Sequence, residues 1–310
     1  MKQSFDEILK IISTLFLKYF NLISTVFQRY IPYFNLTSIV FQPYFHNISF
    51  QKMKITRQLT LAFLLVISTQ TSSFAWGAIG HYVIGKLAEW HMKPETVEKV
   101  EAILQNQSIS GVGIWMDNIR ADKKYDYTNT WHWVTTVDGE YDPSIQEETG
   151  DAYSAFLEIK ENLKKGGLSP EEERDQLRLL IHIVGDLHQP FHVGKPGDRG
   201  GNDVKVSFFN KETNIHAIWD SDMIANKKMS YTEIAHELNK RITPELKEEY
   251  TSKTPADWLR EAAAMRPDMY DIPENNRIGY EYIYKHYHHT EERLTAAGIR
   301  LADILEEIYG

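Results

Sequence analysis

Two histidine–aspartate pairs lie close together in this sequence, and they restrict the folds open to it. The segment LLIHIVGDLHQPFH at 179–192 places His182, Asp186 and His192 at intervals of four and six residues. His216 and Asp220 repeat the four-residue interval in NIHAIWDSDM. Residues four apart on a helix project from one face, so each pair can direct an imidazole and a carboxylate at one point. The spacing therefore predicts a metal cluster on a helical scaffold.

The N-terminal part of the chain has the order of residues found in an export signal. From Met53, the sequence runs through Lys54 and Arg57 into the apolar stretch LAFLLVI and ends at Ala75 after small and polar residues. This order predicts a secretory signal peptide at 53–75, with Trp76 as the new N-terminus. The alternative is a membrane anchor, but the apolar stretch is far shorter than the ~20 residues of a spanning helix. We expect a secreted or periplasmic protein without stable membrane association.

Residues 1–52 carry a repeat to which we assign no function. YFNLISTVFQ at 19–28 recurs as YFNLTSIVFQ at 33–42. This spacing matches neither a heptad seam nor the period of a solenoid. Because Met53 begins a complete export signal, one explanation is a start codon placed too early in the gene. The expected organisation is an upstream segment, a signal peptide and a mature region at 76–310.

Composition limits the chemistry of the mature region. It holds 27 basic and 41 acidic residues, a formal net charge of −14. A surface this acidic does not attract polyanions in general, so nucleic-acid binding would need a local site, to which metal ions could bring positive charge. The chain has no cysteine, which excludes disulfides and zinc–thiolate sites. Metal ligands must come from His, Asp, Glu or the backbone.

Amphipathic spacing predicts that the mature region is mainly helical. The predicted helices cover 78–92, 95–105, 151–164, 171–188, 231–248, 256–265 and 290–309. Ser169 and Pro170, followed by three glutamates, are a typical helix start. The one clear strand signal is VKVSFF at 204–209, expected as half of a short hairpin turning through Asn210 to Asn214. No Gly/Ser/Pro-rich linker divides the region, so we predict a single all-α domain with a short β-hairpin.

Cleavage after Ala75 would create a further ligand. A free α-amino group has a pKa near ~7.7 to 8.0, and together with its own carbonyl it can chelate a metal. Trp76 would supply both groups, with His81 five residues later in WGAIGH. The alternative is that Trp76 is a packing residue beside the cleavage site.

Other candidates are ambiguous when taken singly. Asp117 and Arg120 in GIWMDNIR share a helix face, which is also the pattern of a surface ion pair. His132 lies between two tryptophans in WHWVTT, where a lone histidine more often packs than binds metal. His182 lies on an apolar face, and its burial with Asp186 is costly unless a further group, such as a metal, pairs with them.

Taken in order, the motifs resemble those of a known family. The zinc-dependent single-strand-specific nucleases of fungi, plants and bacteria, the nuclease/3′-nucleotidase family, have motifs similar to WGAIGH, WMDNIR, TWHWV, HIVGDLHQPFH, GGNDV and HAIWDSD. That family shares its fold with bacterial zinc phospholipases C. The resemblance runs from Trp76 to the C-terminal segment GIRLADILEEIYG. It implies one mainly helical, phospholipase C/nuclease-like domain with a trinuclear zinc site in a cleft.

The resemblance also implies the ligands of three zinc ions. The first ion would be held by Asp117, His132, His182 and Asp186. The second would be held by the amino and carbonyl groups of Trp76, by His81 and by the shared Asp186. The third and more open site would comprise His192, His216 and Asp220. All are nitrogen or oxygen donors that zinc accepts without cysteine.

Some residues fall outside this implied site. His188 lies within the central motif but is not a ligand in the family, so we expect it to have a supporting or structural role. The cluster HYHH at 286–289 has no counterpart as a site, and we expect surface or hinge histidines there. The missing cysteines and the segment 138–150 depart from the fungal members, which affects loop structure and substrate preference more than the metal site.

The resemblance implies hydrolysis of single-stranded DNA and RNA to 5′-phosphorylated products, with 3′-nucleotidase activity. Water activated between the first two ions would attack phosphorus, and the third ion would stabilise the departing 3′-oxygen. Asp117 would orient the nucleophile, and Arg120 would neutralise the phosphate. Trp133 would stack on a base and Asn202 would hydrogen-bond a base edge, unless both are structural. We expect a monomer whose only partners are single-stranded nucleic acid and nucleotides.

Two other functions fit part of the pattern. One is a zinc phospholipase C. The short interval from Trp76 to His81 argues against this function, as does Asp220, where the lipase pattern has glutamate. A non-catalytic zinc-binding helical protein is opposed by the third site, because three protein ligands leave the open position typical of catalytic zinc.

Overall fold

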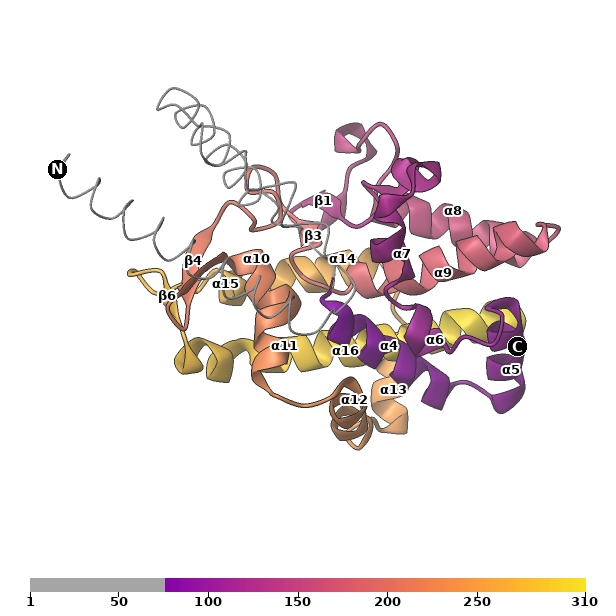
Figure 1. Cartoon of the computed structure of the whole chain (residues 1–310). Coiled ribbons are helices and arrows are strands. Elements are labelled where there is room, and N and C mark those ends of the chain that lie inside the picture. Colours follow the sequence, from indigo (N-terminus) through magenta and orange to yellow (C-terminus); the bar gives the residue numbers. More distant parts are fainter. Residues whose placement is uncertain (1–75) are drawn as a thin grey trace, which may run out of the picture. The chain divides into compact units, whose positions relative to one another are not determined.

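A computed structural model describes residues 76–310 of the chain (Figure 1). The predicted signal peptide and the upstream segment lie outside the described residues. The described part belongs to one compact unit that is mainly helical, as predicted. Among these residues, no helix has the length and apolar character needed to cross a membrane.

The C-terminal helix α16 (Tyr280–Tyr309) forms the centre of the fold. It packs against α4 (Ala78–His91), α5 (Pro94–Ile103), α9 (Pro170–Asp186) and α13 (Pro244–Thr251). In Figure 1, α16 is yellow and runs beside the indigo α4. The first and last helices of the described region are therefore packed together.

The contact between α4 and α16 depends on a small residue. A Cβ added at Gly298 would lie 2.5 Å from the Cβ of Leu87, closer than packed carbon atoms come. Leu87, Leu294 and Leu301 are fully buried around this contact. Burial of each such side chain stabilises the fold by ~1.5–3 kcal/mol.

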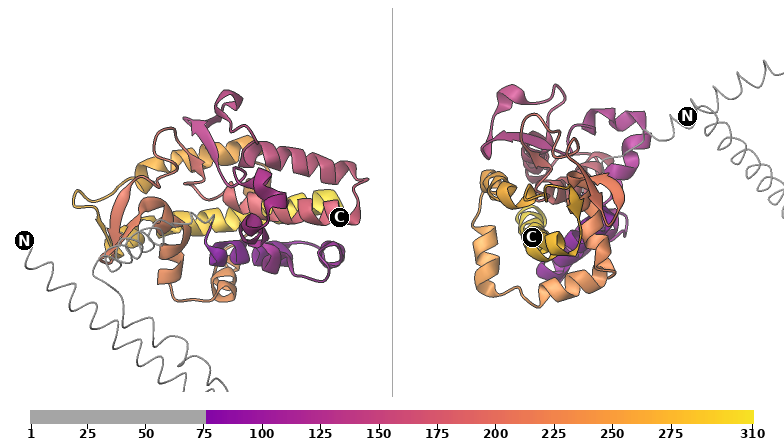
Figure 2. Two further views of the ribbon diagram at one scale, coloured as in Figure 1. Left: turned by 45° about the horizontal axis from the view of Figure 1, so that its top comes forward. Right: turned by 90° about the vertical axis from the view of Figure 1, so that its left-hand side faces the viewer.

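The remaining helices complete the domain around this core (Figure 2). The α-helices are α6 (Ile109–Val112), α7 (Trp115–Asn118), α8 (Ala152–Lys165), α10 (Ile215–Ala217), α11 (Met223–Asn226), α12 (Tyr231–Asn239), α14 (Pro255–Ala264) and α15 (Arg266–Met269). Short 3₁₀ turns cover Ile119–Ala121, Lys123–Thr128 and Pro143–Ile145. The segment η4 (Ile218–Asp222) is a π-helix between α10 and α11.

The helix that carries the central motif begins where the sequence predicts. The Ser169 side chain accepts from the Glu172 amide at 3.3 Å, and the Glu172 carboxylate accepts from the Ser169 amide at 2.9 Å. This reciprocal cap satisfies two amide groups at the start of α9. The helix then runs to Asp186, so that His182 and Asp186 occupy its last two turns.

Two helix predictions were wrong in extent. The predicted 231–248 helix is divided into α12 and α13, because Pro244 begins a new helix and Thr243 caps it by accepting from the Leu246 amide at 3.2 Å. The predicted 290–309 helix begins earlier, at Tyr280. Its first turns are anchored by the buried ring of Tyr282, which a search for aliphatic periodicity misses.

The strands form two small three-stranded sheets. One has the order β2–β1–β3, with β1 at Val134–Val137, β2 at Glu140–Tyr141 and β3 at Val193–Gly194. The other has the order β5–β4–β6, with β4 at Lys205–Phe208, β5 at Lys211–Asn214 and β6 at Arg277–Ile278. Parallel pairing of Val134 with Val193 brings the preceding residues of both segments together.

The predicted hairpin exists, but its turn is shorter than predicted. Phe209 and Asn210 alone connect the two strands, and both have positive φ, 47° and 68°. This two-residue geometry matches the twist of paired strands. The expected turn residue Asn214 instead lies opposite Lys205 in the ladder.

Candidate metal centre

Buried histidines and aspartates gather around the C-terminal turns of α9. Within each of three groups, the candidate ligand atoms lie within 4.8 Å of one another. The groups are His81, Asp117 and His182; His132, His182 and Asp186; and His192, His216 and Asp220. All eight predicted side-chain ligands are thus brought together. His81 lies in a group with Asp117 and His182, and its Nε2 is also 3.4 Å from Oδ1 of Asp186, with which it was predicted to share an ion.

Asp186 lies between histidines of different groups. Its Oδ1 is 3.4 Å from His81 Nε2 and 3.7 Å from His192 Nδ1. Its Oδ2 is 3.1 Å from both His132 Nδ1 and His182 Nε2. The side chain is fully buried. A carboxylate whose two oxygens face different ligands is placed to bridge two cations.

Three of the histidines are oriented by backbone carbonyls. The Nδ1 atoms of His182, His192 and His216 lie 2.7, 2.5 and 2.8 Å from the carbonyl oxygens of Gly113, His132 and Gly200. In a neutral ring, an Nδ1–H that donates to a carbonyl fixes the tautomer, so that the lone pair is on Nε2. This is how metal-binding histidines are commonly held.

Several buried ligand atoms have no hydrogen-bond partner among residues 76–310. They are both ring nitrogens of His81, Oδ1 of Asp117, Oδ1 of Asp186 and Nε2 of His192. An unsatisfied buried polar atom costs about 1–3 kcal/mol. The atoms converge and are all nitrogen or oxygen donors, so divalent cations of the zinc type fit them.

Burial and neighbouring charges shift the ionisation of the cluster. Burial lowers the pKa of His132 to about 4, so its ring is neutral. Burial alone would raise the pKa of Asp186, but His182 and His192 hold it well below its usual range. Burial raises the pKa of Asp220 well above its usual range. A neutral imidazole and an ionised carboxylate are the forms that bind metal, and a cation beside Asp220 would favour its ionised form.

A glycine on α9 makes room for one ligand from α4. A Cβ at Gly185 would lie 2.7 Å from Nδ1 of His81, so a larger residue there would displace the ring. The His81 ring instead stacks on His182, with centroids 4.0 Å apart. The glycine of the HIVGDLH motif is therefore explained by close approach of the two helices.

The start of the described region is tied to the third group. The Gly77 amide donates to the carbonyl of Asp220 at 2.8 Å. The Trp76 indole is fully buried, and its Nε1 has no hydrogen-bond partner among the described residues. The indole is therefore a packing group, and a ligand role for the backbone groups of Trp76 stays a prediction.

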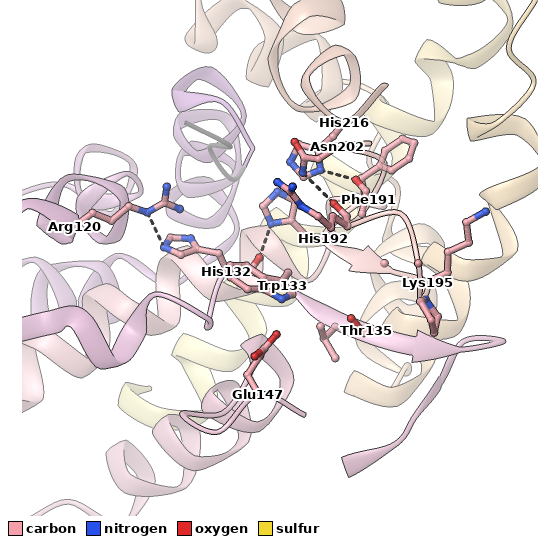
Figure 3. A pocket seen from close by; sticks show the side chains of 16 residues that line it. Arg120, His132, Trp133, Thr135, Glu147, Phe191, His192, Lys195, Asn202 and His216 are labelled. Carbon is pink, nitrogen blue, oxygen red and sulfur yellow. Dashed lines mark hydrogen bonds between the residues drawn. The ribbon is translucent and has the colours of Figure 1, made fainter. Parts of the chain in front are cut away.

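A cavity of about 520 Å³ opens beside the cluster (Figure 3). The cavity is lined by the metal-group residues His132, His192 and His216 and by the predicted Arg120, Trp133 and Asn202. Trp133 is 39% exposed at this wall. The structure therefore places every predicted substrate-contact residue at one opening.

The polar side chains of the cavity already have contacts. Arg120 Nε donates to His132 Nε2 at 3.3 Å, and its NH2 group is 3.4 Å from Asp117 Oδ1. Figure 3 shows Arg120 directed toward His132. The side-chain amide of Asn202 donates to the Arg199 carbonyl at 3.0 Å. Arg120 is thus linked to two predicted ligands, which is more than a surface ion pair.

Sequence reasoning missed several residues of the site. Gln189 donates to Asp220 Oδ1 at 3.0 Å and accepts from the Phe191 amide, so it orients a candidate ligand of the third group. Its place inside HIVGDLHQPFH was an available signal. Lys195 and Arg199 line the cavity, but no local pattern distinguishes them from other surface cations.

Two further histidine predictions have different outcomes. His188 is buried, with Nδ1 2.7 Å from the Val184 carbonyl and Nε2 2.9 Å from Arg300, which is a structural position as expected. At 286–289 we predicted surface or hinge histidines, and the surface alternative is wrong for His286, which is buried because its side of α16 faces the domain interior. His288 is exposed.

Fold and site together define a helical protein with buried His/Asp groups that open into a cavity. A profile of the S1/P1 Nuclease family matches residues 76–310, and the chain belongs to that family. It is a nuclease, an enzyme that hydrolyses phosphodiester bonds of nucleic acid.

Individual relatives are distant in sequence. Endonuclease 3 of Arabidopsis thaliana is 27% identical, over 82% of this chain and 95% of that protein. Nuclease P1 of Penicillium citrinum is also 27% identical, over 48% of this chain and 58% of that protein. Nuclease S1 of Aspergillus oryzae is 27% identical, over 52% of this chain and 60% of that protein.

Proposed function

We propose that residues 76–310 form an exported, zinc-dependent nuclease that cleaves single-stranded DNA and RNA to 5′-phosphorylated products and has 3′-nucleotidase activity. The observation that carries this proposal is the buried position of Asp186, whose two oxygens face histidines of different groups. A carboxylate shared by two cations is suited to a hydrolytic site with paired metal ions.

We assign three zinc ions to the cluster. Asp117, His132, His182 and Asp186 would hold the first; Trp76, His81 and Asp186 the second; and His192, His216 and Asp220 the third. The three groups of converging histidine and aspartate side chains described above support this number. Zinc held there would supply Lewis-acid chemistry, which activates water near neutral pH and neutralises charge on a phosphodiester.

The protein's own side chains would orient the reacting groups. Oδ1 of Asp117 accepts no hydrogen bond from residues 76–310 and lies beside the first group, where it would position the attacking water. The Arg120 guanidinium lies at the cavity wall and would neutralise charge on the phosphate. Its contacts with His132 and Asp117 hold it beside the proposed ligands.

The residues that line the cavity favour a single-stranded substrate. Trp133 is partly exposed there, and an exposed ring can stack on a base that has turned out of its strand, contributing ~1–3 kcal/mol. The side chains of Arg120, Lys195 and Arg199 bring positive charge to the lining of this cavity, in a domain that is otherwise acidic. Asn202 lines the same wall and would contact a base edge.

Removal and return of zinc test this proposal. The purified protein beginning at Trp76 should cleave single-stranded DNA and RNA, lose that activity on chelation and regain it with zinc. The products should carry 5′-phosphates, and His216→Ala should reduce hydrolysis strongly. Zinc-loaded protein that releases phosphocholine from phosphatidylcholine but cleaves no nucleic acid would favour the lipase function. Unchanged hydrolysis by His216→Ala would favour a structural role for the ions.

Export is tested separately. We propose that residues 53–75 are removed as a signal peptide, that residues 1–52 are absent from the mature protein, and that the mature protein is a monomer. Sequencing the N-terminus of exported protein should give Trp76. Retention of residues 1–52 would overturn this proposal and would also deny Trp76 a free amino group.

A further inference from the structure

A fourth cluster of histidine and aspartate lies outside the site described above. Asp268 on α15 and His286 and His289 on α16 have candidate ligand atoms within 4.8 Å of one another. His289 Nε2 is 2.8 Å from Asp268 Oδ2. His286 Nε2 is 3.5 Å from Oδ2 of Asp271, which follows the end of α15.

The nitrogen atoms of this cluster are incompletely satisfied. His286 is only 4% exposed, and its Nε2 has no hydrogen-bond partner among the described residues. The buried Nδ1 of His289 also has none. An ordinary packed histidine would use both nitrogens, because an unsatisfied buried nitrogen costs about 1–3 kcal/mol.

We propose that Asp268, His286 and His289 form a fourth metal site that takes a divalent transition metal such as zinc. Two imidazoles one helical turn apart and a carboxylate from a neighbouring helix are a donor set that zinc accepts. Asp271 offers a further oxygen beside His286. Lys285 contacts Asp271 and Glu281 rather than Asp268, so the carboxylate of Asp268 is not neutralised by this lysine.

A metal ion at the fourth site would link α15 to α16, next to the π-helix that carries Asp220. The His289 ring stacks on Trp219, with centroids 6.3 Å apart. Trp219 Nε1 donates to the Tyr282 hydroxyl at 2.8 Å, and that hydroxyl donates to the Met269 carbonyl at 2.6 Å. An ion joining Asp268 to His289 would therefore reinforce an existing contact between the two helices. The role of this site is to stabilise the fold.

Zinc counting on the purified protein tests the fourth site. The metal-free protein is dialysed against low micromolar zinc, and bound zinc per chain is measured for wild type, Asp268→Asn and His289→Ala. His288→Ala is the matched control, since this histidine is exposed on the same helix turn. Each of the first two variants should bind one zinc ion fewer than wild type, and the control should bind as many as wild type.

Folding is checked by hydrolysis of single-stranded DNA, which the variants should retain because they lie outside the proposed active site. Asp268→Asn is nearly isosteric at an exposed position and decides the test if His289→Ala does not fold. Zinc should also raise the Tm of wild type more than that of Asp268→Asn. Equal zinc binding by wild type and Asp268→Asn, or loss of one ion in His288→Ala, would overturn the proposal. The difference of one ion is independent of the active-site zinc, so the two proposals can fail separately.

Discussion

Two buried polar clusters lie near the end of α9, and they differ in whether the protein itself completes them. In one, the Arg293 and Arg300 guanidinium groups donate to the Glu261 carboxylate at 2.6 and 2.7 Å. Arg300 also contacts His188 Nε2 at 2.9 Å. In the other, neither ring nitrogen of His81 has a hydrogen-bond partner among residues 76–310.

The difference teaches that burial of a histidine does not by itself indicate a ligand. His188 is only two residues from Asp186 and is equally buried, yet both of its nitrogens contact protein groups. We call the set of His188, Glu261, Arg293 and Arg300 the closed network. The His/Asp groups around Asp186 form the open cluster, whose unsatisfied atoms converge. Of these two clusters, the open cluster is the one whose groups could hold a metal ion.

The largest expected effect is in the open cluster. Asp186→Asn keeps the size of the side chain but removes the charge that we expect two zinc ions to share. Hydrolysis of single-stranded DNA should fall by more than about a hundredfold, because changes to groups that only orient metal ligands already cost 10–100-fold. The measurement is kcat/KM together with bound zinc.

The matched control for this substitution is Asp175→Asn on the same helix. Asp175 accepts from the Tyr125 hydroxyl at 2.7 Å and is not a member of any candidate metal group. Its replacement should leave zinc content and kcat/KM near the wild-type values. Equal losses in the two variants would mean that the effect comes from α9 as a whole and not from the ligand.

A substitution in the closed network should lower the free energy of unfolding and leave zinc binding unchanged. Glu261→Gln removes the carboxylate that faces two buried arginines, and breaking such a pair costs 3–5 kcal/mol when it is fully buried. Glu261 is 29% exposed, so we expect a loss of about 2–3 kcal/mol in the free energy of unfolding. Denaturant unfolding measures the loss. A large drop in zinc content with unchanged stability would contradict the comparison.

Two histidine substitutions compare the clusters directly. Without metal, His188→Ala should cost about 1–2 kcal/mol more in unfolding free energy than His81→Ala, because only His188 has protein partners on both nitrogens. With zinc present the order should reverse, since binding to the folded state stabilises it and His81→Ala loses a ligand. Denaturant unfolding of both variants, with and without zinc, checks this. The same order in both conditions would refute it.

The smallest expected effect is a pH dependence of the closed network. Burial alone would raise the pKa of Glu261, but Arg300 and Arg293 outweigh it and lower the pKa below the ordinary 4.5. A carboxylate with a lowered folded-state pKa contributes stability above its unfolded pKa and loses it as pH falls through the folded value. The stability gap between wild type and Glu261→Gln should therefore be constant above about pH 5 and narrow below it. Unfolding curves measured down to pH 3 would show the trend, and a gap that widens in acid would contradict it.

Local spacing was sufficient to predict part of the site. The prediction that His182 and Asp186 share one helix face needed only their four-residue interval and the helix start at Ser169. Asp117 and His132 have no such pattern, and they were assigned through the family resemblance. Their place in the cluster depends on long-range packing, including the parallel pairing of β1 with β3 that puts His132 beside His192.

Other features lay beyond reasoning from one sequence. The carbonyls of Gly113 and Gly200 orient the predicted ligands His182 and His216, but a backbone acceptor cannot be recognised from residue type. The buried position of His286 follows from how the whole of α16 packs, which the motif HYHH alone, interpreted as surface or hinge histidines, does not indicate. The two-residue strands β2, β3 and β6 are too short for periodicity to reveal.

The most direct test of the open cluster is anomalous diffraction at the zinc edge from crystals of the zinc-loaded protein. We predict two peaks flanking the carboxylate of Asp186 and a third among His192, His216 and Asp220. Absence of any peak beside Asp186, in protein that hydrolyses single-stranded DNA, would contradict the account.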